Sequence, residues 1–195
     1  MTENQTDEVG RVVGYVLNLR DSADRGGIAR VRTGLNAETE HRAYGDILPL
    51  LDPTTRKSDE QAYLRAAALV AWHPQITQLE EKRAPIGVTF RRFSINLAKE
   101  RGDQTPFEVD PATPDGIAVR LTQLPEQDLN TATLTLNRIL DIGDGMGIQI
   151  DYFALARTVL RWGNGTSEAS QAIRRTPLRD YYRPLSTSAS KKDDK

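Results

Sequence analysis

Apolar residues recur at three- and four-residue steps along most of the chain, the spacing that places them on one side of a helix. Few stretches alternate apolar and polar residues with a period of two, so we expect no substantial sheet. The pattern therefore predicts an all-α fold of about eight or nine helices. The expected helices cover residues 9–19, 21–35, 44–51, 58–73, 88–101, 117–124, 129–142, 152–162 and 167–182.

The fourth segment is predicted to be the centre of the bundle. Its sequence, EQAYLRAAALVAWHP, is rich in alanine and apolar on most sides, which is typical of a helix surrounded by others. Asp21 or Ser22 is the expected cap of the second helix, and Asp151 and Ser167 are the expected starts of the last two. The last helix contains Pro177, where we expect a kink because proline removes a hydrogen bond from the helix.

Three prolines and a glycine fall within residues 102–114 (GDQTPFEVDPATP), which marks a boundary between two lobes. We expect an N-terminal helical lobe at 9–101 and a C-terminal helical lobe at 115–185. Residues 1–8 and 186–195 are polar and are predicted to be disordered tails.

Composition excludes several classes of protein. The 195 residues include no cysteine, which rules out disulfides, thiolate metal sites and cysteine nucleophiles. No apolar run approaches the roughly 20 residues that span a bilayer. The polar, acidic N-terminus is unlike a signal or transit peptide. We therefore expect a soluble, cytoplasmic protein.

The formal net charge is −1, but the charges are segregated along the chain. Residues 56–99 and 152–185 each carry a net charge of +4, whereas residues 100–151 carry a net charge of −7. Segregation of this kind suggests separate faces for separate partners. Arginine outnumbers lysine 20 to 6. The guanidinium group suits phosphate recognition, although a GC-rich genome produces the same bias.

No catalytic or metal-binding pattern is recognisable. His41 and His73 lie on different predicted segments without metal-ligand spacing, and His73 is expected to cap carbonyls or face solvent at a helix end. The carboxylates at 141–144 are three residues apart rather than two, and no glutamate closes a calcium loop. We expect a non-enzymatic protein with no metal and no cofactor. A hydrolase with an unrecognised active site is a minor alternative.

Basic residues gather instead on three predicted helices and the loop before one of them. Each cluster alone is explained by a solvated face or a surface ion pair. Together, on a chain without a catalytic pattern, they favour salt-sensitive binding to a nucleic-acid backbone. The clusters are Arg25, Arg30 and Arg32; Lys82, Arg83, Arg91, Arg92 and Lys99; and Arg174 and Arg175.

Several short motifs then occur in a specific order. In the first half these are DRG at 24–26, ARVRTGL at 29–35 and AWHP at 71–74. The second half contains MGIQIDY at 146–152, VLRW at 159–162, IRR at 173–175 and RDYY at 179–182. In order and spacing they resemble the CasB family, the small subunits of the type I-E CRISPR surveillance complex Cascade, over residues 9–183.

The resemblance implies an all-α protein of two helical lobes. Its implied partners are the crRNA-bound backbone subunits, the Cascade large subunit, a second copy of itself, and the target and non-target DNA strands. It implies a non-catalytic subunit that stabilises the R-loop. Formation of the R-loop exchanges one duplex for another of similar stability, so a few backbone contacts can shift the equilibrium. Arg32, Arg138 and the arginines of the last helix match basic positions of the family. Trp72, Asp151 and Trp162 match positions interpreted as packing and capping.

The predicted nucleic-acid-binding residues are Arg30, Arg32, Lys82, Arg83, Arg91, Arg92, Lys99, Arg138, Arg174 and Arg175. The alternative function is a helical protein–protein adaptor without nucleic-acid contact. In that alternative the arginines pair with the acidic 100–151 region of a neighbouring copy.

Overall fold

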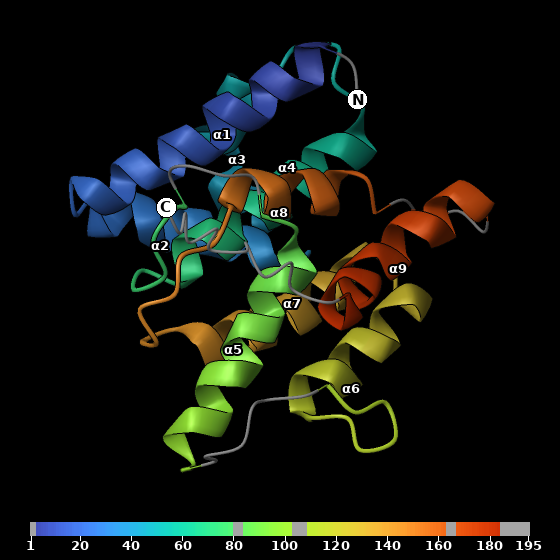
Figure 1. Ribbon diagram of the computed structural model, residues 1–195. Helices are drawn as coiled ribbons and strands as arrows, with labels where there is room; N and C mark the ends of the chain where they lie inside the picture. Colours follow the sequence, from blue (N-terminus) through green and yellow to red (C-terminus); the bar gives the residue numbers. More distant parts are fainter. Residues whose placement is uncertain (1–2, 80–83, 103–108, 163–166, 184–195) are drawn as a thin grey trace, which may run out of the picture.

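The structure, a computed structural model, describes residues 3–79, 84–102, 109–162 and 167–183 (Figure 1). Over these residues it has nine α-helices and no strand, with a single isolated bridge between Gln78 and Ile150, so the all-α prediction is confirmed. None of these helices combines the length and hydropathy that crossing a bilayer requires. The helices are α1 (Glu3–Asp21), α2 (Arg25–Arg32), α3 (Tyr44–Ile47), α4 (Lys57–Trp72), α5 (Ile86–Glu100), α6 (Gly116–Gln123), α7 (Leu129–Gly143), α8 (Tyr152–Leu160) and α9 (Glu168–Tyr182).

Two predicted caps are confirmed. The Asp151 carboxylate accepts a hydrogen bond from the Ala154 N–H at 2.9 Å at the start of α8. The Ser167 hydroxyl accepts one from the Ser170 N–H at 3.3 Å at the start of α9. Because a short polar side chain satisfies an otherwise free backbone donor, these helix starts are readable from the sequence.

The predicted start of the second helix was wrong. The cap of α2 is Asp24, whose carboxylate accepts from the Gly27 N–H at 3.0 Å, and Asp21 instead ends α1. The predicted helix 44–51 is also interrupted: after α3 the chain forms a 3₁₀ turn over Leu48–Leu50. Pro49 lies in that turn and has no N–H with which to continue an α-helix.

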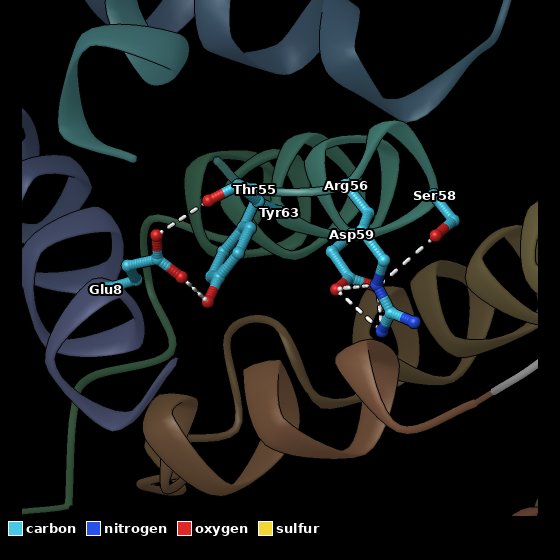
Figure 2. Close-up of polar contacts among 6 residues, drawn as sticks. All are labelled: Glu8, Thr55, Arg56, Ser58, Asp59 and Tyr63. Carbon is cyan, nitrogen blue, oxygen red and sulfur yellow. Dashed lines mark hydrogen bonds and ion pairs between the residues drawn. The ribbon is translucent and has the colours of Figure 1, made fainter. Parts of the chain in front are cut away.

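The first helix already includes residues 3–8, where a tail was predicted. Glu8 is 2% exposed. Its carboxylate accepts hydrogen bonds from the Thr55 hydroxyl at 2.8 Å and the Tyr63 hydroxyl at 2.8 Å (Figure 2). It also accepts one from the Asp52 N–H at 2.7 Å. These partners follow Glu8 by more than forty positions, so the local polarity of the segment gave no sign of its order. The predicted tail 186–195 lies outside the described residues.

Helix α4 is the centre of the bundle, as predicted. Every residue of 62–71 is buried, and α1, α2, α7 and α8 all pack against it. In Figure 1, α1, α3, α4 and α8 lie in the upper part of the view, α5 and α6 in the lower part, and α9 at the right, packed against α5. Helices from both sides of residues 102–114 thus pack together. The lobe boundary predicted at that segment stays a prediction.

Two glycines allow α5 to approach α9 and α7 closely. A Cβ at Gly87 in α5 would lie 2.1 Å from the carbonyl oxygen of Pro177 in α9. A Cβ at Gly143, at the end of α7, would lie 2.3 Å from the ring of Phe93 in α5. Since any side chain at these positions would force the helices apart, glycine sets how α5 packs against α9 and α7.

A fully buried arginine connects α4 to its neighbours. The Arg65 guanidinium forms an ion pair with Glu40 at 2.7 Å, donates from Nε to Asn130 Oδ1 at 3.0 Å, and donates to the carbonyl oxygen of Gly34. Glu40 and Gly34 lie between α2 and α3, whereas Asn130 is in α7. Arg65 therefore fixes α7 relative to the segment that follows α2.

We predict that Arg65→Met lowers the free energy of unfolding by about 3 kcal/mol, because removing one partner strands a buried carboxylate at Glu40. Urea unfolding followed by circular dichroism measures this. The control is Arg56→Met, which breaks an exposed pair with Asp59 and should change stability by less than about 1 kcal/mol. Equal effects of the two substitutions would contradict the role given to Arg65.

We predict that Glu8 stabilises the fold down to acid pH. Burial alone raises the pKa of Glu8, but the hydrogen bonds from Asp52, Tyr63 and Thr55 outweigh it and hold the pKa below the usual 4.5. Because the folded-state pKa is depressed, this stabilisation is present above pH 4.5 and is lost as the pH falls through the folded value. In Glu8→Gln, the unfolding midpoint should fall less steeply below pH 4.5 than in wild type. The exposed control Glu38→Gln should follow wild type, and a Glu8→Gln curve parallel to wild type would refute the assignment.

Candidate nucleic-acid interface

Some arginines outside the predicted set hold the fold together. The Arg20 guanidinium donates to the carbonyl oxygens of Pro74 at 2.9 Å and Ile76 at 2.5 Å, and lies 5.4 Å from the ring centroid of Tyr152. It thereby fixes the segment after α4 against α8. Part of the arginine enrichment is therefore structural, which the composition does not reveal.

Arg30 of the predicted set has a partner within the protein. Its guanidinium pairs bidentately with the Asp46 carboxylate at 2.8 and 2.9 Å, and the Tyr15 hydroxyl donates to the same carboxylate at 2.9 Å. The hydrogen bond from Arg30 is the main cause that lowers the pKa of Asp46, against the opposing effect of burial. The Arg30 side chain keeps 54% of its surface exposed. The pair joins α2 to α3.

Arg32 lies against the end of α4. Its Nε donates to the carbonyl oxygen of Ala71 at 2.9 Å, one of the last carbonyls of the helix. Its guanidinium carbon lies 5.2 Å from the ring centroid of Trp72, within the range of a cation–π contact. Trp72 is nevertheless 41% exposed, so the interpretation of this tryptophan as a packing residue was wrong.

Helix α7 runs beside α4 in the same direction, because Asn130 contacts Arg65 and Asn137 lies 3.0 Å from Nε2 of His73. The next residue after Asn137 is Arg138, which is exposed. Leu134, one turn earlier, is 36% exposed. The chain neighbours of these two residues, Trp72 and Arg138, therefore lie on adjacent helices, close in the fold to the contact of His73 with Asn137.

We call the group Arg32, Trp72, Leu134 and Arg138 the Trp72 surface. It combines three elements: the end of α2, the end of α4 and the exposed side of α7. Acidic side chains lie nearby: Asp141, three residues after Arg138 on α7, is 59% exposed, and Asp144 accepts a hydrogen bond from the Gln75 N–H at 3.2 Å.

The side chain of His73 is buried beneath this surface, at 1% exposure, and does not face solvent as one predicted alternative had it. Burial is the main cause that lowers the pKa of His73, opposed by Asn137 and the Asp141 charge. His73 is therefore neutral at pH 7. Among the described residues, no three histidine, aspartate or glutamate side chains are grouped to hold a metal ion.

The α5 cluster divides between two environments. Arg92 and Lys99 are seven residues apart, hence on one side of the helix, and both are exposed. Arg91 points elsewhere: it is half-buried and donates to the carbonyl oxygen of Arg183 at 2.8 Å. Lys82 and Arg83, predicted to belong to this cluster, lie outside the described residues.

The α9 cluster is also divided. Arg174 is half-buried, and its Nε donates to the carbonyl oxygen of Trp162 at 3.1 Å, whereas Arg175 is exposed and donates to Gln171 at 3.1 Å along the same helix. Trp162 is fully buried, as its interpretation as a packing residue required. Because α9 packs against α5, the two clusters belong to adjacent helices.

The predicted residues therefore fall into two kinds. Arg30, Arg32, Arg91 and Arg174 are anchored to acceptors of the protein. For Arg92, Lys99 and Arg138, no side-chain acceptor occurs among the described residues, and all three are exposed. Cations of the second kind can bind phosphate without first breaking an internal contact.

The sequence model for the CRISPR-associated protein Cse2 matches residues 27–182. A solved chain of a "CRISPR RNA-guided surveillance complex" aligns with a TM-score of 0.61, over 90% of this chain and 93% of the other, at 19% identity. At that identity the alignment indicates a common fold. The curated proteins yielded no match.

We predict that iodide quenches the fluorescence of only one of the two tryptophans, because Trp72 is 41% exposed and Trp162 is fully buried. The quenching plot of wild type should curve downward, as expected for one accessible and one shielded fluorophore. Trp72→Phe should remove the accessible fraction. If iodide quenched the same fraction of the fluorescence in wild type and in Trp72→Phe, the exposure of Trp72 would be contradicted.

Proposed function

The chain belongs to the CRISPR-associated Cse2 family, the small subunits of type I-E Cascade, and from this we propose that it is a non-catalytic, nucleic-acid-binding subunit of such a complex. In this role it binds the target and displaced DNA strands through their backbones and stabilises the R-loop. Its partners are the crRNA-bound backbone subunits, the large subunit and a second copy of the chain, in the cytoplasm.

The observation that carries the proposal is the set of exposed cations on α5 and α7. Arg92, Lys99 and Arg138 have no acceptor among the described residues. Contacts between such cations and phosphates do not depend on base sequence, which suits a subunit of a complex whose guide RNA reads the sequence. The exchange of DNA pairing for heteroduplex pairing is nearly balanced, so a few contacts of this kind shift it.

The anchored arginines contribute differently. Arg30 holds α2 against α3, and Arg32 holds α2 against α4. Arg91 of α5 binds the carbonyl oxygen of Arg183 just after α9, and Arg174 in the middle of α9 binds the carbonyl oxygen of Trp162. Arg175 and the basic residues Lys82 and Arg83 belong to the proposed interface with the exposed cations. The adaptor alternative lacks a specific supporting contact among the described residues.

We predict that the triple variant Arg92→Ala, Lys99→Ala and Arg138→Ala assembles into the complex but binds target DNA more weakly. Each lost contact to a single strand should reduce the slope of log K against log salt by about 0.7, so the triple variant should lose about 2 units. Titration of target DNA at several salt concentrations measures both quantities.

The matched control removes three exposed arginines outside the predicted set, Arg42, Arg56 and Arg161. It changes the net charge equally, so a general field effect would affect both triple variants alike. The proposal requires the loss of slope in the first variant only. An unchanged affinity and slope in a normally assembled first variant would refute direct nucleic-acid contact and favour the adaptor alternative.

A further inference from the structure

We infer that the exposed ring of Trp72 is a stacking platform for one base of a single-stranded nucleic acid. This inference rests on the proposed function and deepens it. It adds a base-stacking residue to an interface otherwise built from backbone contacts.

The position of Trp72 is unusual for so large an apolar side chain. All ten residues before it in α4 are buried, and the residue after it, His73, is 1% exposed. Trp72 alone among these emerges, with 41% of its surface exposed. No hydrogen-bond partner of its indole N–H occurs among the described residues. Exposure of so much aromatic surface to water is unfavourable, which suggests that a ligand covers the ring.

The ring is held in place from one side. The Arg32 guanidinium carbon lies 5.2 Å from the ring centroid. Arg32 is itself fixed by the hydrogen bond from its Nε to the carbonyl oxygen of Ala71 at 2.9 Å. Because this arginine is anchored on the same helix end, it supports the ring without needing to rearrange. Because the tryptophan side chain is already ordered, stacking of a base on it costs less conformational entropy than stacking on a mobile ring.

The charges around the ring favour a nucleic acid over an apolar protein segment. The Arg32 guanidinium lies on the ring of Trp72, and the exposed Arg138 lies on α7, the helix beside α4. A stacked base carries a phosphate before and after it, and we infer that these two cations bind the flanking phosphates. Asp141 lies 3.7 Å from Nδ1 of His73, so the strand is expected to approach the ring from the side of Arg32. Stacking is tolerant of sequence because every base has an aromatic face, which suits non-specific binding.

Tyr44 provides the matched comparison. It is 39% exposed, close to the value for Trp72, but its hydroxyl donates to Glu40 at 3.2 Å. Glu60 and Lys57 line the same pocket as Tyr44, and Glu40 is already paired with Arg65. A ring of equal exposure that has no guanidinium stacked on it, and whose hydroxyl is bonded to a carboxylate, should not bind a single strand.

The first test uses the full chain and oligothymidylate at low ionic strength, with tryptophan fluorescence as the readout. Trp162 is fully buried with its N–H bonded to the Gln127 carbonyl oxygen at 3.0 Å, so quenching by the oligonucleotide reports Trp72. Wild type should be quenched as it binds. Trp72→Phe, which retains only Trp162, should bind without quenching.

The second test measures affinity by anisotropy of a labelled oligothymidylate. Trp72→Ala should bind about 5- to 150-fold more weakly, the range that corresponds to about 1–3 kcal/mol for one base–aromatic stack, with an unchanged salt slope. Trp72→Phe should recover most of the affinity, which excludes misfolding as the cause. Tyr44→Ala should bind like wild type.

The outcomes distinguish the two proposals. Binding with a normal salt slope but without Trp72 quenching or a Trp72→Ala effect overturns the stacking platform and leaves the backbone interface intact. A Trp72→Ala variant that binds oligothymidylate normally but fails to join the complex identifies the ring as a protein contact and also overturns the inference. Absence of any binding to wild type at low salt overturns both proposals for this chain.

Discussion

The buried guanidinium of Arg65 is the contact on which the arrangement of the surface depends. From the middle of α4 it reaches Glu40 and the Gly34 carbonyl on one side and Asn130 of α7 on the other. Burying a charge is costly unless its donors are occupied, so these three partners are required together. The same contact fixes how α7 lies beside α4, and hence where Arg138 lies relative to Trp72. The internal contacts of Arg65 thus help to set the position of α7, and of the exposed Arg138 on it, relative to α4.

The sequence revealed the helices far better than it revealed the roles of the arginines. Helix starts depend on local chemistry, such as the carboxylate of Asp151 three residues before the N–H it accepts from, and local patterns predict them. The predicted cap of the second helix, Asp21 or Ser22, was wrong because α1 continues to Asp21 and Asp24 caps α2. Glu8 and Trp72 were misread for a different reason. The partners that bury Glu8 and the exposure of Trp72 both depend on packing between distant segments.

The arginines serve two purposes that composition cannot separate. Arg20 and Arg65 donate hydrogen bonds to backbone carbonyl oxygens in turns that would otherwise lack a donor. Arg92 and Arg138 project from helices already held by other contacts, so their charge is available to a partner. A net charge of −1 is therefore compatible with an interface for an anionic polymer, because the local density of exposed cations matters more than the total.

The central claim is that the exposed cations of α5 and α7 contact DNA in the assembled complex. Its most direct test is photocrosslinking, with benzoylphenylalanine in place of Arg138 and, for comparison, in place of Arg56, which lies at the opposite end of α4. With labelled target DNA bound, we predict crosslinks from position 138 to a DNA strand and none from position 56. Crosslinks from position 138 that reach only protein subunits would contradict the claim.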